Sequence, residues 1–252
     1  MKLVLVVLMS MFLFITLNAQ QNQTDSQGRK QGEWVKYYPN SVVPMYVGQF
    51  KDDKPVGTFT YYYPSKKVKS IVKHNPNTGR SEAYFYHDNK KLLAFGIYYH
   101  QKKDSVWTHY GPSGRISFRE TYKDGELNGL KTVYYVPELV EDRTVEPMSE
   151  HYYVNGRLNG PAKEYFPGGV LKLEGVFKDG KYEGAVKHYH PNGKLHYIER
   201  WRDRRKHGWW IVYDQQGKET SRKYYNHNVE LTGERLEQHL QKLKEQGKNP
   251  ND

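Results

Sequence analysis

One stretch of the chain decides the fold: residues 178–201 read KDGKYEGAVKHYHPNGKLHYIERW. Asp179-Gly180 and Asn192-Gly193 are turn signals, because both residues of such pairs tolerate positive φ. The residues before and after Asn192-Gly193, 185–190 and 195–201, are rich in aromatic and branched side chains, which favours extended strands. The stretch therefore predicts a β-hairpin that is closed at Asn192-Gly193.

The pattern recurs along the chain with a tyrosine at a nearly constant interval. Successive tyrosines are 24 or 25 residues apart, except for one interval of 31. They are Tyr37, Tyr62, Tyr86, Tyr110, Tyr134, Tyr165, Tyr189 and Tyr213. Five residues before them stand Gly32, Gly57, Ser81, Ser105, Gly129, Gly160, Gly184 and Gly208. Units this short cannot bury a core alone, so the period predicts a tandem array over residues 31–231.

The links between units are too short for crossover helices. Asp124-Gly125, Asn155-Gly156 and Asp179-Gly180 mark tight turns between hairpins, so neighbouring strands must be antiparallel. Eight hairpins predict about sixteen strands in one elongated all-β meander, roughly 70 to 75 Å long at about 4.8 Å per strand. Strand twist should curve the sheet.

The two ends of the chain differ from the array. Residues 1–19 combine Lys2, an apolar run at 3–17 and Ala19, which predicts a secretory signal peptide and a periplasmic or extracellular location. An uncleaved anchor is the alternative, although 15 apolar residues are few for a span of roughly 20. The polar residues 20–30 predict a flexible leader.

After the last repeat the pattern becomes helical. Leu236, Leu240 and Leu243 recur at helical spacing, which predicts a helix over 232–247 that caps the last strand edge. A helix that binds a partner is the alternative. Residues 248–252 are expected to be frayed.

Composition limits the classes of function. The formal charge is +11, and it becomes +10 if residues 1–19 are removed with Lys2, which favours partners of negative charge. The chain has 23 tyrosines and no cysteine, so a disulfide framework and a lipoprotein thiol are excluded. Nucleic acid fits the charge but does not fit export.

These residues resemble the MORN repeat, in the bacterial variant with Gly-x-aromatic-x-x-Tyr-Tyr, a polar-Gly turn and Asp-Gly before the next unit. The resemblance runs from about Asp25 to Tyr225. It implies a hairpin array that binds or scaffolds other molecules without catalysis of its own. Some bacterial members are named as YwqK-type antitoxins, which implies a toxin protein as partner, an alternative that the predicted export disfavours.

No catalytic motif is present in the sequence, and the expectation is a protein without catalytic residues, cofactor or metal. His188, His190 and His196 were the best candidates for a metal site. A hairpin closed at Asn192-Gly193 would place His190 opposite Leu195 and His188 opposite Tyr197, with His196 on the other face beside Tyr189. Two histidines on one face make a weak site.

The residues 200–210 form the most unusual local run. Arginine offers paired donors to phosphate or carboxylate, and tryptophan offers stacking. The candidate anion-binding residues are Arg200, Trp201, Arg202, Arg204, Arg205, Lys206, Trp209 and Trp210. The alternative is a solvated loop between hairpins whose tryptophans pack in the sheet.

The interval of 31 residues reflects an acidic insertion within residues 136–148, which holds Glu138, Glu141, Asp142 and Glu146. A longer hairpin tip is the simpler interpretation, since longer loops cost little. A partner-specific finger is the alternative.

Three hypotheses about function follow. The leading one is an exported, non-enzymatic scaffold for a protein partner at the cell envelope. The second is a binder of phospholipid head groups or acidic wall polymer through the basic aromatic surface. The third is carbohydrate binding on exposed rings.

Overall fold

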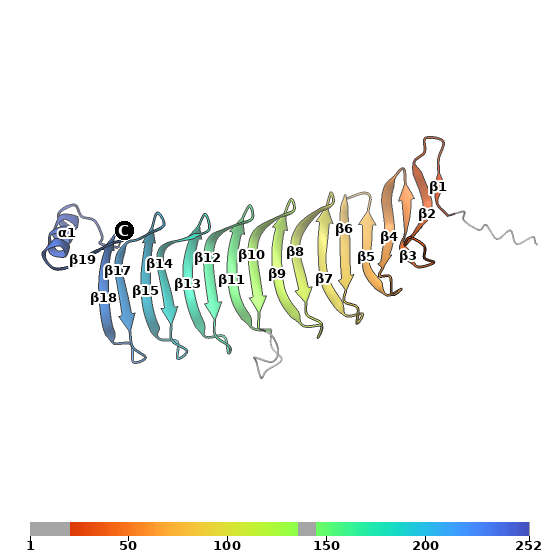
Figure 1. Cartoon of the computed structure of the whole chain (residues 1–252). Coiled ribbons are helices and arrows are strands. Elements are labelled where there is room, and N and C mark those ends of the chain that lie inside the picture. The colour runs from red at the N-terminus through yellow and green to blue at the C-terminus, as the bar shows by residue number, and fades with distance from the viewer. Residues whose placement is uncertain (1–20, 136–144, 252) are drawn as a thin grey trace, which may run out of the picture.

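The computed structural model describes residues 21–135 and 145–251, so the predicted signal peptide lies outside the described residues. Within them, nineteen strands form one open sheet that is followed by one helix, α1 (Gly233–Glu245) (Figure 1). The strands are β1 (Gln23–Thr24), β2 (Lys30–Tyr37), β3 (Pro44–Lys51), β4 (Lys54–Tyr62), β5 (Val68–Asn75), β6 (Arg80–Tyr86), β7 (Leu92–Tyr99), β8 (Lys102–Tyr110), β9 (Ile116–Lys123), β10 (Glu126–Tyr134), β11 (Pro147–Val154), β12 (Arg157–Tyr165), β13 (Leu171–Lys178), β14 (Lys181–Tyr189), β15 (Leu195–Arg202), β16 (Arg205–Lys206), β17 (Gly208–Tyr213), β18 (Glu219–Asn226) and β19 (Val229–Leu231).

The sheet is an antiparallel meander, as predicted. Each strand pairs with its neighbours in the sequence, and β15 pairs with both β16 and β17. The eight expected hairpins run from β2–β3 to β17–β18. The strands beyond the predicted sixteen are the short β1, β16 and β19. Because β1 and β19 are so short, the sheet ends in little open edge, which limits pairing with other chains.

The loops lie along two edges of the sheet. At the first, here called the turn edge, two-residue turns join one hairpin to the next, and both turn residues have positive φ, as in Asp179 (+49°) and Gly180 (+79°). At the second, the tip edge, longer loops close each hairpin. There the prediction for Asn192-Gly193 was wrong: only Gly193 has positive φ, and the loop is closed by a bond from His190 N–H to Lys194 O of 2.8 Å.

The recurring glycine five residues before each tyrosine allows a bulge. Gly184 has a φ of +74°, and the register between β13 and β14 shifts beside it, between Glu174 and Val176. The hairpin that carries Ser81 lacks this shift, since β5 and β6 pair without irregularity, and Ser81 does not have positive φ. Glycine is therefore favoured where the bulge occurs, because other residues rarely adopt this conformation, although Ser105 does so, with a φ of +60°, at the bulge between β7 and β8.

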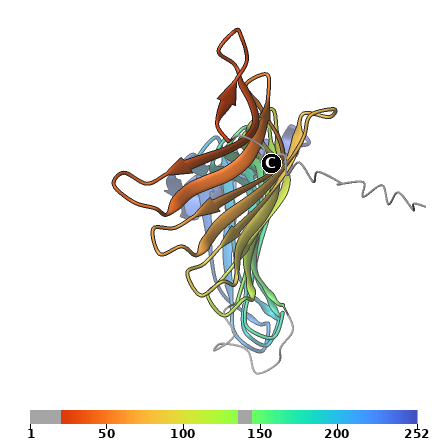
Figure 2. The same ribbon diagram turned by 90° about the vertical axis from the view of Figure 1, so that its right-hand side faces the viewer.

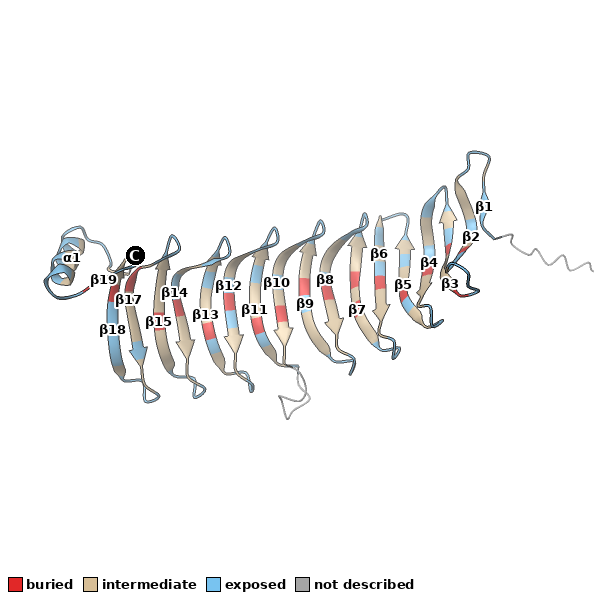
Figure 3. Cartoon of the chain, viewed as in Figure 1, coloured by how far each residue is buried: buried red, intermediate tan, exposed pale blue. Residues whose placement is uncertain are grey.

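The two faces of the sheet differ, and face A is defined as the one that carries Phe59, Trp107 and Val186. Its buried side chains form a line across the middle of the strands (Figure 3). Large residues of one hairpin lie over small residues of the preceding strand: Phe59 over Gly48, Trp107 over Gly96 and Val186 over Gly175. Opposite sizes at neighbouring positions let a single sheet pack without a second layer.

A ladder of side-chain hydrogen bonds joins the hairpins at the tip edge. The residue after a repeat tyrosine donates to the backbone carbonyl of the next repeat tyrosine. The bonds are Tyr38 to Tyr62 (2.8 Å), Tyr63 to Tyr86 (3.1 Å), His87 to Tyr110 (2.9 Å), Tyr135 to Tyr165 (2.6 Å) and His190 to Tyr213 (3.0 Å). Gly111 and Phe166 occupy the equivalent positions and have no side-chain donor, so the ladder has two gaps.

Phe166→Tyr is expected to close one gap and raise the free energy of unfolding by about 1 kcal/mol, the net value of one hydrogen bond. The new hydroxyl would donate to the carbonyl of Tyr189, as Tyr135 does to that of Tyr165. Urea denaturation of the full chain measures the change. Tyr135→Phe is the matched control and should lower the stability by a similar amount; a neutral Phe166→Tyr would contradict the ladder.

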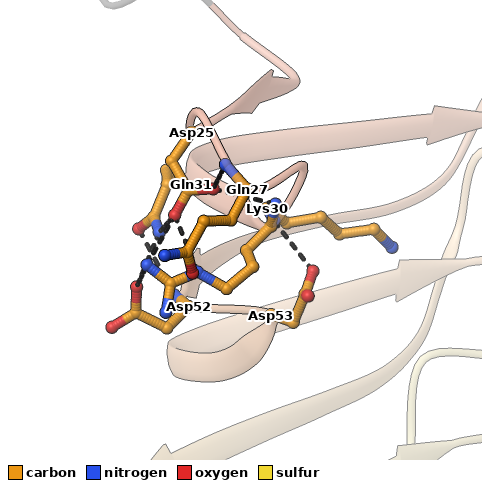
Figure 4. A network of polar contacts seen from close by, with 7 residues as sticks. Asp25, Gln27, Lys30, Gln31, Asp52 and Asp53 are labelled. Carbon is orange, nitrogen blue, oxygen red and sulfur yellow. Dashed lines mark hydrogen bonds and ion pairs between the residues drawn. The ribbon is translucent and has the colours of Figure 1, made fainter.

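The N-terminal residues 21–30 are ordered, which differs from the predicted flexible leader. Asp25 accepts bonds from the backbone of Gln27 and Arg29 and from the side chains of Arg29 and Gln31, and Arg29 also reaches Asp52 at 3.0 Å (Figure 4). These bonds hold the Asp25 pKa far below its usual range, with Arg29 as the main cause. The polar composition of residues 21–30 predicts disorder, but the carboxylate and guanidinium groups of this segment bond to each other and to the first turn.

The C-terminal helix forms as predicted and lies at the C-terminal end of the sheet (Figure 1), where it contacts β18. His239 of α1 approaches Tyr224 of β18, with Nε2 3.2 Å from the hydroxyl. Tyr224 is fully buried and pairs with Trp209 on face B, the opposite face. The tail is not frayed: Pro250 O accepts from the Tyr224 hydroxyl at 3.0 Å, and Asn251 Oδ1 accepts from Trp209 N–H at 3.1 Å.

The acidic insertion falls at the tip edge, between β10 and β11. Residues 136–144, with Glu138, Glu141 and Asp142, lie outside the described residues. Glu146 is described, and its carboxylate accepts a bond of 2.8 Å from Gly168 N–H in the next tip. This acidic side chain thus contributes to the contact between two repeats.

Candidate functional site

A groove lies on face A near the N-terminal end of the sheet and is here called the aromatic groove. It has a volume of about 820 Å³ and crosses the sheet from β3 to the turn after β7. Figure 2 shows that the N-terminal strands turn away from the direction of the C-terminal strands, so the sheet is strongly twisted in this part. The twist brings aromatic side chains from several strands around one concave surface.

The floor and walls of the groove are rings. Phe59 forms part of the floor and is 2 % exposed. Tyr46 and Tyr61 stand side by side with ring centroids 5.8 Å apart, and Phe50 meets Phe59 edge to face at 5.1 Å. Tyr98 lies on the far side. Pairs of this geometry add stability beyond area alone, so the groove is preformed.

The loop 76–79 shapes one end of the groove. The other links between successive hairpins at the turn edge are two-residue turns, whereas this one has four residues, Pro76 to Gly79. It lies against the next turn, because His100 N–H donates to Gly79 O at 3.0 Å. A Cβ at Gly79 would lie 2.8 Å from the His100 ring, so glycine allows the close approach.

The polar side chains that line the groove are mostly uncharged. His74 bonds through Nδ1 to the Ser81 hydroxyl at 2.9 Å and packs its ring against Phe59. Burial lowers the pKa of His74, and burial, followed by the neighbouring Tyr46, raises the pKa of Tyr61. Both side chains are therefore neutral near pH 7. Lys54 is the single Lys, Arg, Asp or Glu side chain among the residues that line the groove.

Buried histidines make the stability of the array depend on pH. Burial is the main cause that lowers the pKa of His74, His109, His151, His196 and His239. The unfolded chain, with histidine pKa values near about 6.5, then binds more protons than the folded chain. The buried histidines therefore contribute their full stabilisation above that pH. This contribution is lost as the pH falls from there through their lower folded-state pKa values.

We expect a lower Tm at pH 5 than at pH 7.5, measured by circular dichroism at constant ionic strength. His151→Gln should flatten this dependence, because it removes one of the groups that resist protonation. Equal Tm values at the two pH values would contradict the prediction.

The structure divides the predicted anion-binding run between two faces. Trp201 and Trp210 lie on face A with ring centroids 5.4 Å apart, and Lys206 lies 4.5 Å above the Trp210 ring. Arg200, Arg202 and Trp209 belong to face B by register, since Arg200 opposes Ala185 and Trp209 opposes Tyr224. The eight residues therefore do not converge on one surface.

Several members of the run already have partners in the fold. Arg200 donates from Nη1 to Trp209 O, and burial lowers the pKa of its guanidinium. Trp210 donates from Nε1 to Arg200 O at 3.1 Å. Arg204 lies in the turn after β15, and Arg205 opposes Arg202 across it. Arg202, Arg204 and Arg205 are exposed and are the members best placed to meet a ligand.

The three histidines are arranged differently from the prediction. His188 does oppose Tyr197, but Tyr189, rather than His190, opposes Leu195. The His190 ring lies 4.2 Å from that of His196, because the longer tip loop carries His190 out of the strand. Within residues 21–135 and 145–251, no group of three or more His, Cys, Asp or Glu side chains is placed to hold a metal ion.

Sequence reasoning missed the aromatic groove. Its residues come from three hairpins, and only the twist brings them together. One signal was present: Pro76-Asn77-Thr78-Gly79 is longer than the corresponding turns in the other repeats. No helix in the described part of the chain has the length and apolar character needed to span a bilayer.

These features define an open, single-layer array of β-hairpins, a repeat protein with a preformed aromatic groove. A family model described as MORN repeat variant matches residues 55–75, 158–179 and 182–203. The chain therefore contains MORN repeats of this variant type, and the matches fall on β4–β5, β12–β13 and β14–β15. A search of the curated proteins found no match.

Proposed function

We propose that this protein is an exported, non-enzymatic scaffold at the cell envelope, and that it binds a segment of a partner protein in the aromatic groove. The observation that supports the proposal is the groove itself, a preformed concavity of about 820 Å³ with five Tyr and Phe rings in its lining. All-β MORN-repeat folds are typically not catalytic, which agrees with a binding role.

The composition of the groove fits a protein partner better than a charged ligand. Charged residues make up 27 % of the chain, yet only Lys54 represents them in the groove. The cores of protein interfaces are likewise rich in Tyr and Phe and poor in charge. Rigid rings also lose little conformational entropy when they bind, so they are effective anchors for a partner.

A site-specific crosslink tests the proposal. A photoreactive phenylalanine, p-benzoylphenylalanine, replaces Tyr61 in the full chain, and cells that make the protein are irradiated. Tyr152 is the matched control, since it is an exposed tyrosine (43 %) on face B. We expect one protein adduct from the Tyr61 position, in the envelope fraction, that is absent from the Tyr152 position.

Binding in a groove whose lining holds one Lys, Arg, Asp or Glu side chain should largely persist at high salt, because screening acts on exposed charges. Equal adducts from both positions, or none from Tyr61, would contradict the groove as the binding site. Loss of the adduct in the presence of a neutral oligosaccharide would favour carbohydrate instead. Recovery of the protein in the cytoplasm with residues 1–19 still attached would contradict export.

A further inference from the structure

A row of positive side chains runs along the turn edge on face B, away from the aromatic groove. The register places these residues directly beside four successive turns, from the turn after β9 to the turn after β15. We call the row the basic rail, and it consists of Lys123, Arg157, Lys178, Lys181, Arg202 and Arg205. All six side chains are exposed.

Two pairs in the rail place like charges opposite each other. Lys178 opposes Lys181 and Arg202 opposes Arg205, in neighbouring turns. Like charges at directly opposite positions of a sheet are destabilising. In residues 21–135 and 145–251, none of the six rail residues forms an ion pair with a carboxylate. Arg202 Nη1 lies 3.4 Å from His207 Nε2, and the fold tolerates the repulsion between the paired cations without a neutralising carboxylate in this part of the chain.

The lysines of the tip edge behave differently. Lys67 pairs with Asp88 at 2.7 Å, and Lys91 and Lys194 donate to backbone carbonyls of the next tip, at 2.8 and 3.0 Å. Those cations join one repeat to the next. The rail has no such task, so its charges remain available for a ligand.

The acidic residues near the rail do not form a matching row. Glu126 opposes Lys123, and Glu183 lies on face B near Lys181, so two acidic side chains interrupt the row. Asp124, Asp179 and Asp203 occupy the turns themselves, and their side chains are short, whereas lysine and arginine extend their charges well beyond the backbone. A hollow of about 120 Å³ between two turns is lined by three cations and three carboxylates. The equal numbers of cations and carboxylates make the hollow a poor pocket for a single anion. The excess of positive charge lies along the basic rail instead.

We infer that the basic rail binds a linear polymer of phosphate groups, laid along the turn edge across β9 to β16. Four turns that are two strands apart span about 29 Å at about 4.8 Å per strand. One row of charges matches a one-dimensional polyanion, whereas a membrane would need a two-dimensional patch. Lysine and the forked donors of arginine both suit phosphate. The rail lies on the opposite face from the aromatic groove, so this inference is independent of the proposed protein partner.

Binding of labelled inorganic polyphosphate to the full chain, measured by fluorescence anisotropy, tests the inference. The rail variant carries Lys178→Gln, Lys181→Gln, Arg202→Gln and Arg205→Gln. The control variant carries Lys66→Gln, Lys90→Gln, Arg115→Gln and Lys218→Gln, which removes four exposed charges from the tip edge. Both variants have the same net charge, so a difference between them reports position.

We expect the rail variant to bind at least about tenfold more weakly than the wild type, and the control variant to change less than about threefold. The slope of log K against log salt should fall by about 4 in the rail variant, since each lost phosphate contact reduces it by about one. Triphosphate should bind far more weakly than the long chain. The Tm of the rail variant should stay equal or rise, because the like-charged pairs are gone.

Equal weakening in both variants would overturn the inference, since net charge alone would then explain binding. Preference for phosphatidylglycerol vesicles over the polymer would overturn it in favour of a membrane surface. Equal affinity for polyglutamate would overturn the choice of phosphate. If polyphosphate binding survives in the rail variant while the Tyr61 crosslink still forms, only the rail is wrong, because the two tests use separate surfaces.

Discussion

Gly96→Ala is expected to destabilise the protein by about 3 kcal/mol, the upper part of the usual cost of overpacking. A Cβ at this position would lie 2.1 Å from Cδ2 of Trp107. Trp107 is 2 % exposed and is held by a bond from Nε1 to Ile97 O of 3.1 Å, so its ring cannot move aside without losing this contact. Urea denaturation followed by tryptophan fluorescence measures the loss.

Gly175→Ala is the matched control. It occupies the equivalent place, but the nearest atom to its Cβ is Cγ2 of Val186 at 3.1 Å, which needs a shift of only a few tenths of an ångström. We expect a cost of less than about 1 kcal/mol there. If Gly96→Ala cost no more than Gly175→Ala, the size-matched line on face A would not control stability.

A second substitution that compensates for the first also tests whether large side chains must face small ones on face A. Trp107→Ala alone should cost about 3 to 5 kcal/mol, because it leaves a cavity over Gly96. Adding Gly96→Val should recover part of that loss, since Val72 opposite Ala83 already uses this arrangement in the preceding hairpins. A double variant that is less stable than Trp107→Ala would contradict the pairing of large with small side chains.

Lys131→Met is expected to cost about 2 to 3 kcal/mol. Glu120 is 8 % exposed, and Lys131 Nζ lies 2.9 Å from its Oε1. Removal of one partner of a buried pair leaves a charge uncompensated, which costs about 3 to 5 kcal/mol in a dry site. The expected loss is smaller here because the Lys131 side chain keeps 29 % exposure, and the Tyr122 hydroxyl still donates to Glu120 at 2.8 Å.

The pH dependence separates this effect from simple loss of packing. Burial raises the pKa of Glu120, but the bonds from Lys131 and Tyr122 outweigh it, so the folded-state value is lowered. The pair thus stabilises the wild type above the unfolded pKa, and that contribution is lost as the pH falls through the folded value. In Lys131→Met the lone carboxyl gains from protonation, so the difference from the wild type should shrink at pH 4.

Glu120→Leu combined with Lys131→Met supplies the control for that pair. Well-packed apolar residues often replace a buried ion pair at little cost, so the double variant should regain most of the loss. A double variant as unstable as Lys131→Met would show that packing, rather than the unpaired charge, causes the effect.

Short-range chemistry made most of the fold predictable. Tyr189, Gly184 and Asp179-Gly180 each act within one repeat, and their spacing predicted the hairpins, the antiparallel order and the length of the array. The helix followed from Leu236, Leu240 and Leu243. The loop of the hairpin at Asn192-Gly193 was predicted wrongly. A tight turn with positive φ at both residues was expected, but the hairpin closes with a longer loop in which only Gly193 of this pair has positive φ.

Features that depend on several repeats were not predictable in the same way. The aromatic groove needs the twist that brings Tyr46 and Tyr98 around one hollow. The predicted run at 200–210 was contiguous in sequence, but successive residues of a strand point to opposite faces, so register divided it. The role of Asp25 was not predicted because the polar composition indicated disorder, whereas its partner Arg29 also meets Asp52 only after folding.

The gaps at Gly111 and Phe166 divide the eight hairpins into groups of four, two and two that are joined internally by tyrosine and histidine bonds. In a one-dimensional array, the least coupled junctions open first. Amide hydrogen exchange should therefore report three cooperative blocks instead of one, and a chain pulled from its ends should lengthen in three steps. A protein built this way would unfold under tension block by block, while the N-terminal four hairpins that carry the groove remain folded together.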